Sequence, residues 1–264
     1  FDCVHIDTVP TPVAKWGEAL VQVAATSVNP SDVDGVERGS CGKGCGADVS
    51  GTVVECPGCT RLKVGDEVWG LGRPAFAEYV ALSEKTTGLK PPSMAFEDAG
   101  TIPEVGLTSF LSLKRTTHAP GTDLPAGTPW DPSKFGNLTV LVTSGAGGTG
   151  SAGIQLAKAW GAQHIATAAS GDAFAFVESL GATYVTDYKK QDIFDTLADN
   201  SVDIVCTLSA DRIPCLHCAC ARLNVPPFLR PQTITTVPRA PRTRRCAPSG
   251  PAARICCCRT PRAT

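Results

Sequence analysis

Hydrophobic and polar positions follow two different rhythms along the chain. In the N-terminal part, short stretches rich in Val and Thr alternate partly between apolar and polar residues, which predicts β-strands. These stretches cover residues 19–28, 49–54 and 76–82, and the Gly-Asp pair at 65–66 marks a tight turn. Apolar residues recur at helical spacing only from Ser93 onward. The N-terminal part is therefore predicted to be β-rich, with Gly and Pro at its turns.

Further along, apolar strands alternate with amphipathic helices. The strands are predicted at residues 138–144, 164–170, 182–188 and 202–205. Such regular alternation is typical of βαβ units that build a parallel sheet. The polar segment from Thr116 to Asn137, with four prolines and three glycines, is interpreted as a linker or an insertion.

Past Val205 neither rhythm continues. Nine prolines are spread over the rest of the chain, too frequent for helices or central strands, and large apolar residues are few. Charge divides at the same point, because the first 205 residues carry 24 acidic and 14 basic residues and the remainder carries ten arginines and one acid, Asp211. The formal net charge of -1 thus joins an acidic body to a basic tail. We expect residues 206–264 to be a disordered tail.

Composition excludes several classes of protein. A chain of 264 residues, 42% hydrophobic and 19% charged, can bury a core and is neither collagen-like nor wholly disordered. No secretory leader is evident, so the 13 cysteines are not expected to form a disulfide framework. The longest uncharged stretch, Phe135 to Ala157, carries six glycines, so no membrane span is expected. A cytoplasmic location is predicted, and an organellar one stays open.

The clearest chemical motif is a glycine-rich turn between the strand at 138–144 and the helix after it. Gly145, Gly147 and Gly150 have the spacing G-x-G-x-x-G. Glycines there allow a tight turn, a close approach of the backbone to a pyrophosphate and close packing of helix on strand. The N–H groups and the dipole at the helix start favour the phosphate charge. The motif predicts a dinucleotide site, and a glycine turn without a ligand is the alternative.

The end of the second strand of this region indicates which dinucleotide is bound. An NAD site normally has Asp or Glu there, about 20 residues past the glycines, to bind the ribose 2′-hydroxyl. Residues 167–170 provide no carboxylate, which removes repulsion against a 2′-phosphate, and Ser170 can hydrogen-bond one. The sequence therefore favours NADPH. Asp172 and the absence of Arg or Lys just after the strand weigh against this choice.

Seven segments that follow one another in a fixed order carry a family resemblance. They are SVNPSDVDGVERG (27–39), GADVSGTVVE (46–55), KVGDEVWG (63–70), FAEYVAL (76–82), IPEVGLTSFLSL (102–113), VTSGAGGTGSAGIQLAKAWGA (142–162) and SLGATYVTDY (179–188). Through them the chain resembles the medium-chain dehydrogenase/reductase superfamily, in its zinc-independent quinone oxidoreductase branch of zeta-crystallin-like proteins and enone reductases.

The resemblance implies an α/β fold in three parts. Residues 1–112 would form a GroES-like β domain, and residues 113–205 an incomplete Rossmann domain, which is a doubly wound parallel sheet. Residues 206–264 would be the Arg-, Pro- and Cys-rich tail. The active site of the family lies in the cleft between its two domains.

The resemblance also implies site residues. The pyrophosphate turn is matched by Gly147, Gly148, Thr149 and Gly150. Ser170 and Tyr188 match positions that hold the 2′-phosphate end of NADPH. Asn29 and Thr108 match positions near the nicotinamide and are candidates for ordering cofactor or substrate in catalysis.

No catalytic metal is expected. Zinc-dependent relatives have Cys at the position of Asn29 and a His-Glu pair at the position of Ala47 and Asp48, so the ligands for tetrahedral zinc are missing. Cys56 and Cys59 form a C-x-x-C pair at positions where family members usually have Val-type residues. A metal-binding or redox role of this pair is an alternative to a structural one.

The implied function is NADPH-dependent transfer of a hydride to a quinone or an α,β-unsaturated carbonyl without zinc. Family members are usually homodimers, but the segment that carries their dimer edge is replaced here after Val205. One alternative is a truncated, inactive relative with residual nucleotide binding. Another is an interaction protein that acts through its basic tail, although the tail lacks the interleaved aromatic residues of a nucleic-acid binder. No membrane partner is expected.

Overall fold

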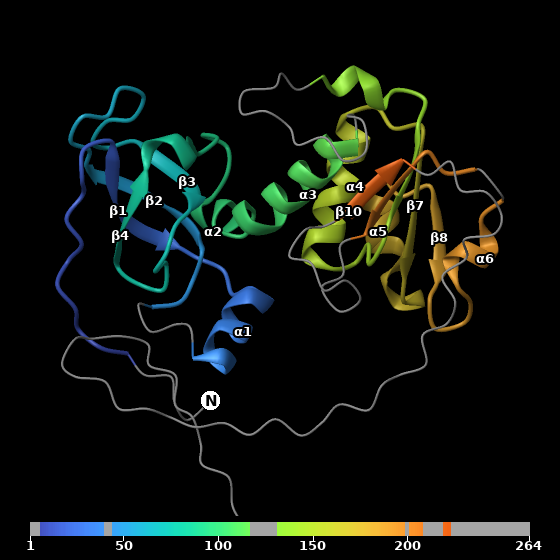
Figure 1. Ribbon diagram of the computed structural model, residues 1–264, viewed down its shortest axis with the longest axis horizontal. Helices are drawn as coiled ribbons and strands as arrows, with labels where there is room; N and C mark the ends of the chain where they lie inside the picture. The colour runs from blue at the N-terminus through green and yellow to red at the C-terminus, as the bar shows by residue number, and fades with distance from the viewer. Residues whose placement is uncertain (1–5, 40–43, 117–130, 199–200, 208–218, 223–264) are drawn as a thin grey trace, which may run out of the picture. The chain divides into compact units, whose positions relative to one another are not determined.

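The computed structural model describes residues 6–39, 44–116, 131–198, 201–207 and 219–222 (Figure 1). Contacts within the chain divide it into two compact units, with the boundary between Glu104 and Val105. The predicted division between residues 112 and 113 falls within helix α3 (Pro103–Thr116). Each unit is described by itself below.

The N-terminal unit is built on an antiparallel sheet with the strand order β4-β1-β2-β3-β5. The strands are β1 (Glu18–Ala25), β2 (Asp48–Glu55), β3 (Glu67–Leu71), β4 (Tyr79–Ser83) and β5 (Thr87–Leu89). The helical segments are α1 (Pro30–Arg38), η1 (Glu84–Thr86) and α2 (Phe96–Ala99). The strands predicted from the alternating pattern are present as β1, β2 and β4. Helix α1 and strands β3 and β5 were not predicted. Helix α1 has only two large apolar residues, Val33 and Val36, and the two strands are short.

The core of this unit comes from β-branched side chains on one face of the sheet. Val21 lies opposite Val53 of β2 on one side and opposite Val80 of β4 on the other, and all three are almost fully buried. Leu62 and Val68 extend the same cluster. Branched side chains pack well on a pleated surface, which is why these Val-rich stretches form strands.

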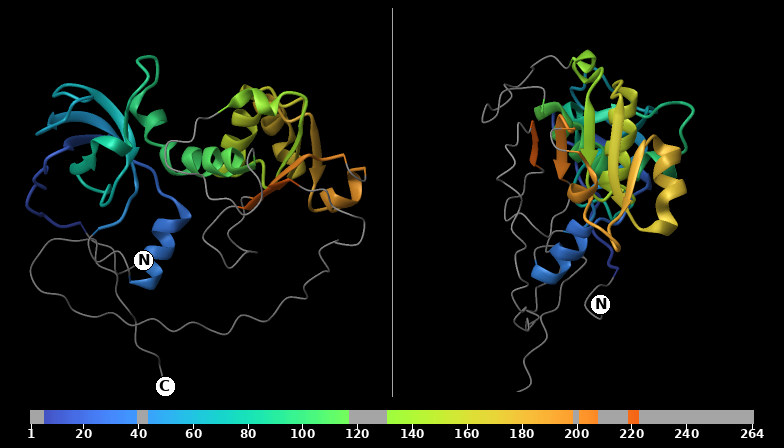
Figure 2. Two further views of the ribbon diagram at one scale, coloured as in Figure 1. Left: turned by 45° about the horizontal axis from the view of Figure 1, so that its top comes forward. Right: turned by 90° about the vertical axis from the view of Figure 1, so that its right-hand side faces the viewer.

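The second unit contains a sheet with the order β10-β9-β6-β7-β8, in which β9, β6, β7 and β8 are parallel. The strands are β6 (Thr139–Val142), β7 (His164–Ala169), β8 (Tyr184–Asp187), β9 (Ile204–Thr207) and β10 (Ala219–Arg222). The helical segments besides α3 are η2 (Pro132–Phe135), α4 (Gly148–Ala159), η3 (Gly171–Ala173), α5 (Phe174–Leu180) and α6 (Ile193–Thr196). All four predicted strands are confirmed, and they can be followed in Figure 2.

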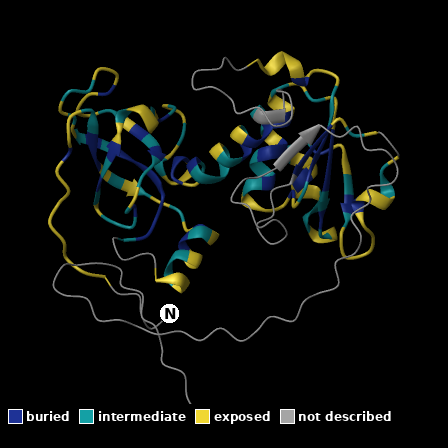
Figure 3. Ribbon diagram, viewed as in Figure 1, coloured by how far each residue is buried: buried dark blue, intermediate teal, exposed yellow. Residues whose placement is uncertain are grey.

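The strand order creates a switch point in the sheet. The chain runs from β6 outward to β7 and β8, and then returns to place β9 on the opposite side of β6. Both faces of the sheet are covered: Val140 and Val142 pack with Ile154 of α4, whereas Leu141 packs with Ile193 of α6. Buried residues are concentrated along these strands in Figure 3. These features confirm the predicted parallel, doubly wound sheet.

Strand β10 corrects the expectation that no strand follows Val205. Strand β9 extends to Thr207, and residues Ala219 to Arg222 pair with it in antiparallel register. The reason is local, because the sequence ACAR holds no proline and an edge strand needs hydrogen bonds on one side only. The rest of the predicted tail, residues 208–218 and 223–264, lies outside the described residues.

Candidate functional site

The glycine turn joins the end of β6 to the start of α4. Gly145 is buried and donates its N–H to the carbonyl of Ala168 at 3.2 Å, which ties the turn to β7. Gly147 donates to the carbonyl of Ser144 at 2.9 Å, and Ser144 has a left-handed φ of 56°. Ala146 and Gly147 are exposed. The turn is therefore fixed to the sheet at its base and open to solvent at its tip.

Two of the glycines are required by close contacts. A Cβ at Gly150 would lie 2.1 Å from the carbonyl oxygen of Ser144. A Cβ at Gly145 would lie 2.1 Å from Oγ1 of Thr167, which itself donates to the carbonyl of Val142 at 2.7 Å. Only glycine lets the helix start so close to the strand ends, as the sequence motif predicts.

The start of α4 fits a pyrophosphate. The N–H groups of Gly148, Thr149 and Gly150 begin a helix of 12 residues and have no carbonyl one turn earlier within it to accept them. The helix dipole adds partial positive charge at the same place. Gly147 and Gly148 are exposed and have no side chain to cover the backbone. The turn can therefore bind a phosphate group through its N–H donors.

Helix α3 packs against this turn within the same unit. The hydroxyl of Ser109 donates to the carbonyl of Thr149 at 2.7 Å, and the side chain of Val105 would lie 3.1 Å from a Cβ at Gly148. Thr108, the predicted nicotinamide-side residue, is half-buried and directly precedes Ser109. The backbone of Thr108 is thereby held next to the helix that starts at the turn.

Ser170 and Tyr188 follow the adjacent strands β7 and β8. The N–H of Tyr188 donates to the carbonyl of Ala169 at 3.3 Å, and its side chain is 60% exposed. The hydroxyl of Ser170 hydrogen-bonds the carboxylate of Asp172, and this bond is the main reason why the pKa of Asp172 is lowered. Both predicted residues therefore lie at the carboxyl ends of the strands, where a doubly wound sheet binds its ligand.

Lys189 was not predicted as a candidate residue from the sequence. The absence of a cation just after β7 weighed against NADPH, but the positive charge of Lys189, which follows β8, also lowers the pKa of Asp172. The register explains this, because Ala169 at the end of β7 pairs with Asp187 at the end of β8. The signal was available in the parallel sheet itself, since the carboxyl ends of neighbouring parallel strands meet at one edge.

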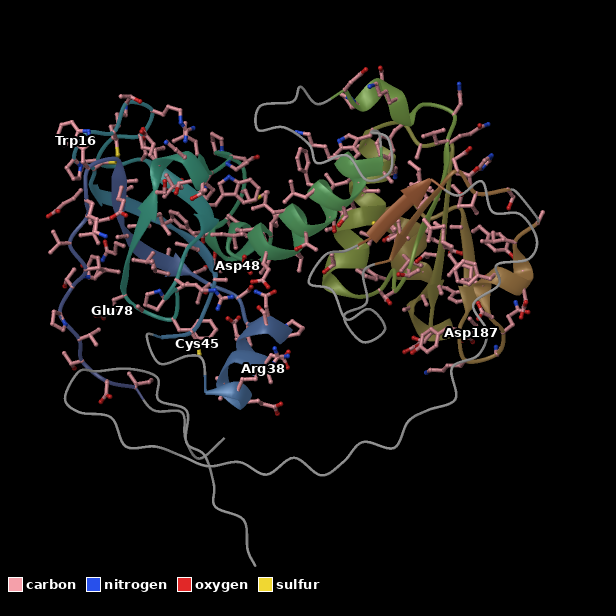
Figure 4. All side chains as sticks on the ribbon, viewed as in Figure 1. Trp16, Arg38, Cys45, Asp48, Glu78 and Asp187 are labelled. Carbon is pink, nitrogen blue, oxygen red and sulfur yellow. A yellow bond between two sulfur atoms is a disulfide. The ribbon has the colours of Figure 1, made fainter. Side chains whose placement is uncertain are left out.

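In the N-terminal unit, Asn29 precedes helix α1 and is 6% exposed. Its Nδ2 donates to Oδ2 of Asp48 at 2.7 Å. Asp48 is fully buried, and it also accepts hydrogen bonds from the hydroxyl of Ser27 and, at 2.6 Å, from the N–H of Glu104. The carboxylate of Asp48 thus accepts hydrogen bonds from three groups, of which the amide of Asn29 is one. Asp48 is labelled in Figure 4.

Asp32 serves the local structure of helix α1. Its Oδ2 accepts the N–H of Asn29 at 2.9 Å, and its Oδ1 accepts the N–H of Gly46 at 3.1 Å. Arg73 lies 3.6 Å from the same Oδ1. This arrangement is that of a capping residue that also fastens a neighbouring loop.

Cys56 and Cys59 form a disulfide and Cys45 is also disulfide-bonded, although the sequence was not expected to form a disulfide framework. The turn after β2 brings the Cα atoms of Cys56 and Cys59 to 5.5 Å, within the usual range for a disulfide. Among the described residues, no group of three or more His, Cys, Asp or Glu side chains could hold a metal ion. No helix in the described ranges is long and apolar enough to cross a membrane.

Family models match both units. The model of the alcohol dehydrogenase GroES-like domain matches residues 15–92, and that of the zinc-binding dehydrogenases matches residues 148–214. The first match confirms the predicted GroES-like domain. The second begins at Gly148, in the glycine turn, and covers strands β7, β8 and β9 of the parallel sheet.

Individual relatives agree with this assignment. The chain is 34% identical over 207 residues to the chloroplastic NADPH-dependent alkenal/one oxidoreductase of Arabidopsis thaliana, covering 71% of this chain and 49% of the relative. It is 34% identical over 194 residues to a chloroplast envelope quinone oxidoreductase homolog of the same plant, covering 69% and 55%. The first relative is described as chloroplastic, and a matching oxidoreductase of Bos taurus is described as mitochondrial, so the cytoplasmic location remains a prediction.

A solved structure extends the comparison. The quinone oxidoreductase from Coxiella burnetii is 30% identical, with a TM-score of 0.60, and the match covers 75% of this chain and 61% of that one. The chain spans about half the length of the two plant relatives. It therefore belongs to the medium-chain dehydrogenase/reductase superfamily, in its zinc-independent quinone oxidoreductase branch.

Proposed function

We propose that this chain binds NADPH and transfers a hydride to a quinone or an α,β-unsaturated carbonyl without a catalytic metal. The observation that carries the proposal is the glycine turn. Helix α4 starts close to the strand ends only because Gly145 and Gly150 have no Cβ, which would collide with neighbouring atoms there. The Arabidopsis relative described as an NADPH-dependent alkenal/one oxidoreductase supports this substrate class.

The residues of the second unit would hold the cofactor. The N–H groups of Gly148, Thr149 and Gly150 would bind the pyrophosphate, and the exposed ring of Tyr188 would lie near the adenosine end. Ser170 and Lys189 would contact the 2′-phosphate. Lys189 is our candidate cation for this group, because it follows β8, whose last residue Asp187 pairs with Ala169 just before Ser170.

The chemistry of the bound nicotinamide is hydride transfer. The protein has to orient the acceptor and stabilise negative charge on its oxygen as the hydride arrives. The hydroxyl of Thr108 is our candidate donor to that oxygen. The amide of Asn29, whose Nδ2 already donates to Asp48 and to Ser27, is our candidate for orienting cofactor or substrate. Asp48 fixes the orientation of that amide by accepting from its Nδ2 at 2.7 Å.

A mechanism without zinc is supported by the same contacts. Zinc prefers thiolate, imidazole or carboxylate ligands. An amide occupies position 29, and the carboxylate of Asp48 accepts hydrogen bonds from Ser27, Asn29 and Glu104. Asp48 is therefore used as an acceptor for protein donors.

The proposal is tested by titrating the full chain with NADPH and with NADH, following the cofactor fluorescence, and then adding a quinone or an enone. We expect saturable binding, tighter for NADPH, followed by oxidation of the cofactor. Lys189→Ala should weaken NADPH binding about tenfold and leave NADH binding unchanged, which corresponds to the loss of one charge-assisted contact of about 1.4 kcal/mol. Lys134→Ala, an exposed lysine of η2, is the matched control. Equal affinity for both cofactors in the wild type would contradict the NADPH assignment.

Binding without oxidation would instead support an inactive relative with residual nucleotide binding. The third possibility, an interaction through the basic tail, predicts salt-sensitive binding of nucleic acid. It should disappear when residues 223–264 are deleted, a truncation that keeps strands β9 and β10.

A further inference from the structure

The turn that follows strand β2 carries a disulfide between residues three positions apart. The turn contains Cys56, Pro57, Gly58 and Cys59, and the N–H of Cys59 donates to the carbonyl of Cys56 at 3.3 Å. Gly58 has a left-handed φ of 71°, which glycine adopts without strain. The residues proposed for hydride transfer, Thr108, Asn29 and Asp48, are not part of this turn.

Backbone contacts hold the turn without help from the sulfur atoms. The N–H of Gly17, just before β1, donates to the carbonyl of Pro57 at 2.8 Å. Cys56 and Cys59 are half-buried and pack against the Val-rich core of the N-terminal unit. When the disulfide opens, these contacts keep the two cysteines close together, so the pair can close again at little entropic cost.

A short loop of this kind gains little stability from its disulfide. The stabilisation grows with the length of the loop that the bond closes, and here the loop is already closed by a backbone hydrogen bond. Disulfides at the surface are also those that exchange most readily with thiols. Stability alone therefore gives a weak reason for pairing these cysteines.

The reduced form has a partner for one of its thiols. Sγ of Cys59 lies 3.8 Å from the carbonyl oxygen of Glu18, a distance at which a thiol can donate a weak hydrogen bond. In the disulfide this contact involves no hydrogen. Reduction thus adds an interaction for Cys59 where the oxidised pair has none.

An exposed tryptophan lies directly against the turn. A Cβ at Gly58 would lie 2.2 Å from Cε2 of Trp16, so the indole ring rests on the glycine backbone between the two cysteines. Trp16 is nevertheless 84% exposed, and Figure 4 shows it beside the disulfide. Because disulfides quench indole fluorescence at short range, Trp16 can report on the state of the pair.

We propose that Cys56 and Cys59 form a redox-active site that exchanges reversibly with small thiols of the glutathione class. A thiolate attacks Sγ of Cys56, which breaks the S–S bond, forms a mixed disulfide and releases Cys59, which takes up a proton and donates to Glu18. A second thiolate attacks the mixed disulfide and releases Cys56, which is protonated in turn. The pair gains two electrons and two protons, and two thiols become one disulfide.

The test equilibrates the full chain in glutathione buffers of graded ratio, followed by acid quenching, alkylation and mass spectrometry of the peptide that contains residues 56–59. We expect a single reversible transition between an unlabelled and a doubly labelled peptide while circular dichroism stays native. Tryptophan fluorescence should rise severalfold at Trp16 over the same range of ratios. Cys45, which is also disulfide-bonded, is followed in its own peptide as an internal comparison.

Three variants make the result decisive. Trp16→Phe should lose the fluorescence change and keep the labelling transition, whereas Cys56→Ser combined with Cys59→Ser should lose both. Gly58→Ala, which forces a Cβ against the indole, should shift the transition and the fluorescence together. The proposal is overturned if the folded pair stays oxidised in excess reduced glutathione, stays reduced in excess oxidised glutathione, or changes only when the chain unfolds. Loss of NADPH binding in the titration above would leave these results unaffected.

Discussion

The two units differ in what they bury. Among the described residues, the buried charged side chains, Asp32, Asp48 and Lys90, all belong to the N-terminal unit. The buried polar side chains of the second unit are uncharged hydroxyls. The antiparallel unit thus fastens its loops with charges that accept or donate several hydrogen bonds. The parallel unit relies on apolar packing and on the absence of Cβ atoms at its turn.

The difference follows from how the two kinds of sheet are built. The parallel sheet is covered on both faces, so its strands are apolar throughout and polar groups collect at the strand ends. The antiparallel unit has long connections between short strands, and their backbone N–H groups need buried acceptors. Asp48 shows this, because it accepts the N–H of Glu104, 56 positions further along the chain.

The comparison is tested most severely by Asp48→Ala. It leaves the amide of Asn29, the hydroxyl of Ser27 and the N–H of Glu104 without their acceptor. We expect a loss of about 4 kcal/mol in the free energy of unfolding, since each unsatisfied buried donor costs about 1–3 kcal/mol. Urea denaturation measures it. Asp34→Ala, an exposed carboxylate on helix α1, is the control, and an equal effect there would refute the role of burial.

In the second unit the corresponding test is Gly150→Val. Its side chain would collide with the carbonyl of Ser144, so we expect a loss of about 3 kcal/mol and no detectable NADPH binding. Gly136→Ala is matched to it, because a Cβ there meets its nearest atom at 3.4 Å, φ is −54° and the residue lies outside the proposed site. Unfolding curves and cofactor titrations should show lower stability and weaker binding for Gly150→Val than for the control. Similar curves would show that the close contact at residue 150 determines neither stability nor cofactor binding.

Lys90→Met sharpens the comparison at a smaller scale. The ammonium group of Lys90 donates to the carbonyls of Pro91 and Met94 at 3.2 and 2.5 Å and pairs with Glu67 at 3.0 Å. Met keeps the apolar stem and removes these contacts, so we expect a loss of about 2 kcal/mol by thermal or urea unfolding. Lys134→Met, on the exposed surface of the second unit, should change stability by no more than about 0.5 kcal/mol. A neutral Lys90→Met would mean that burying this charge gives no net stability.

The smallest expected effect is a pKa change at the surface. The hydroxyl of Ser170 lowers the pKa of Asp172, so the contribution of Asp172 to stability is present above about pH 4 and is lost as pH falls through its lowered pKa. Ser170→Ala should raise the pKa of Asp172 towards its ordinary value, as followed by NMR of the carboxyl carbon. The pKa of Glu84, lowered mainly by the N–H groups of Arg61 and Leu62, should stay unchanged. A shift at both carboxylates would indicate a global change.

The parallel unit was the easier one to predict from sequence. Its apolar strands and the glycines of 145–150 are local signals, and the structure places them as expected. Lys189 could be found only from the predicted sheet and not from local spacing, because its place beside Ser170 depends on the pairing of β7 with β8. In the N-terminal unit the network around Asp48 joins residues from position 27 to position 104, and no periodic pattern encodes such a contact.

The switch point at β6 also has a kinetic consequence. Strand β6 reaches β7 after one helix, but its pairing with β9 joins residues 64 positions apart, as the bond from Thr139 to Asp203 shows. Longer loops cost more entropy to close. We therefore expect β9 to join the sheet late in folding and to leave it early, so that its amide hydrogens exchange with solvent before those of β6 and β7. Strand β10 pairs with β9 and can form only after β9 has joined the sheet. The formation of this last strand therefore depends on the strands that precede it.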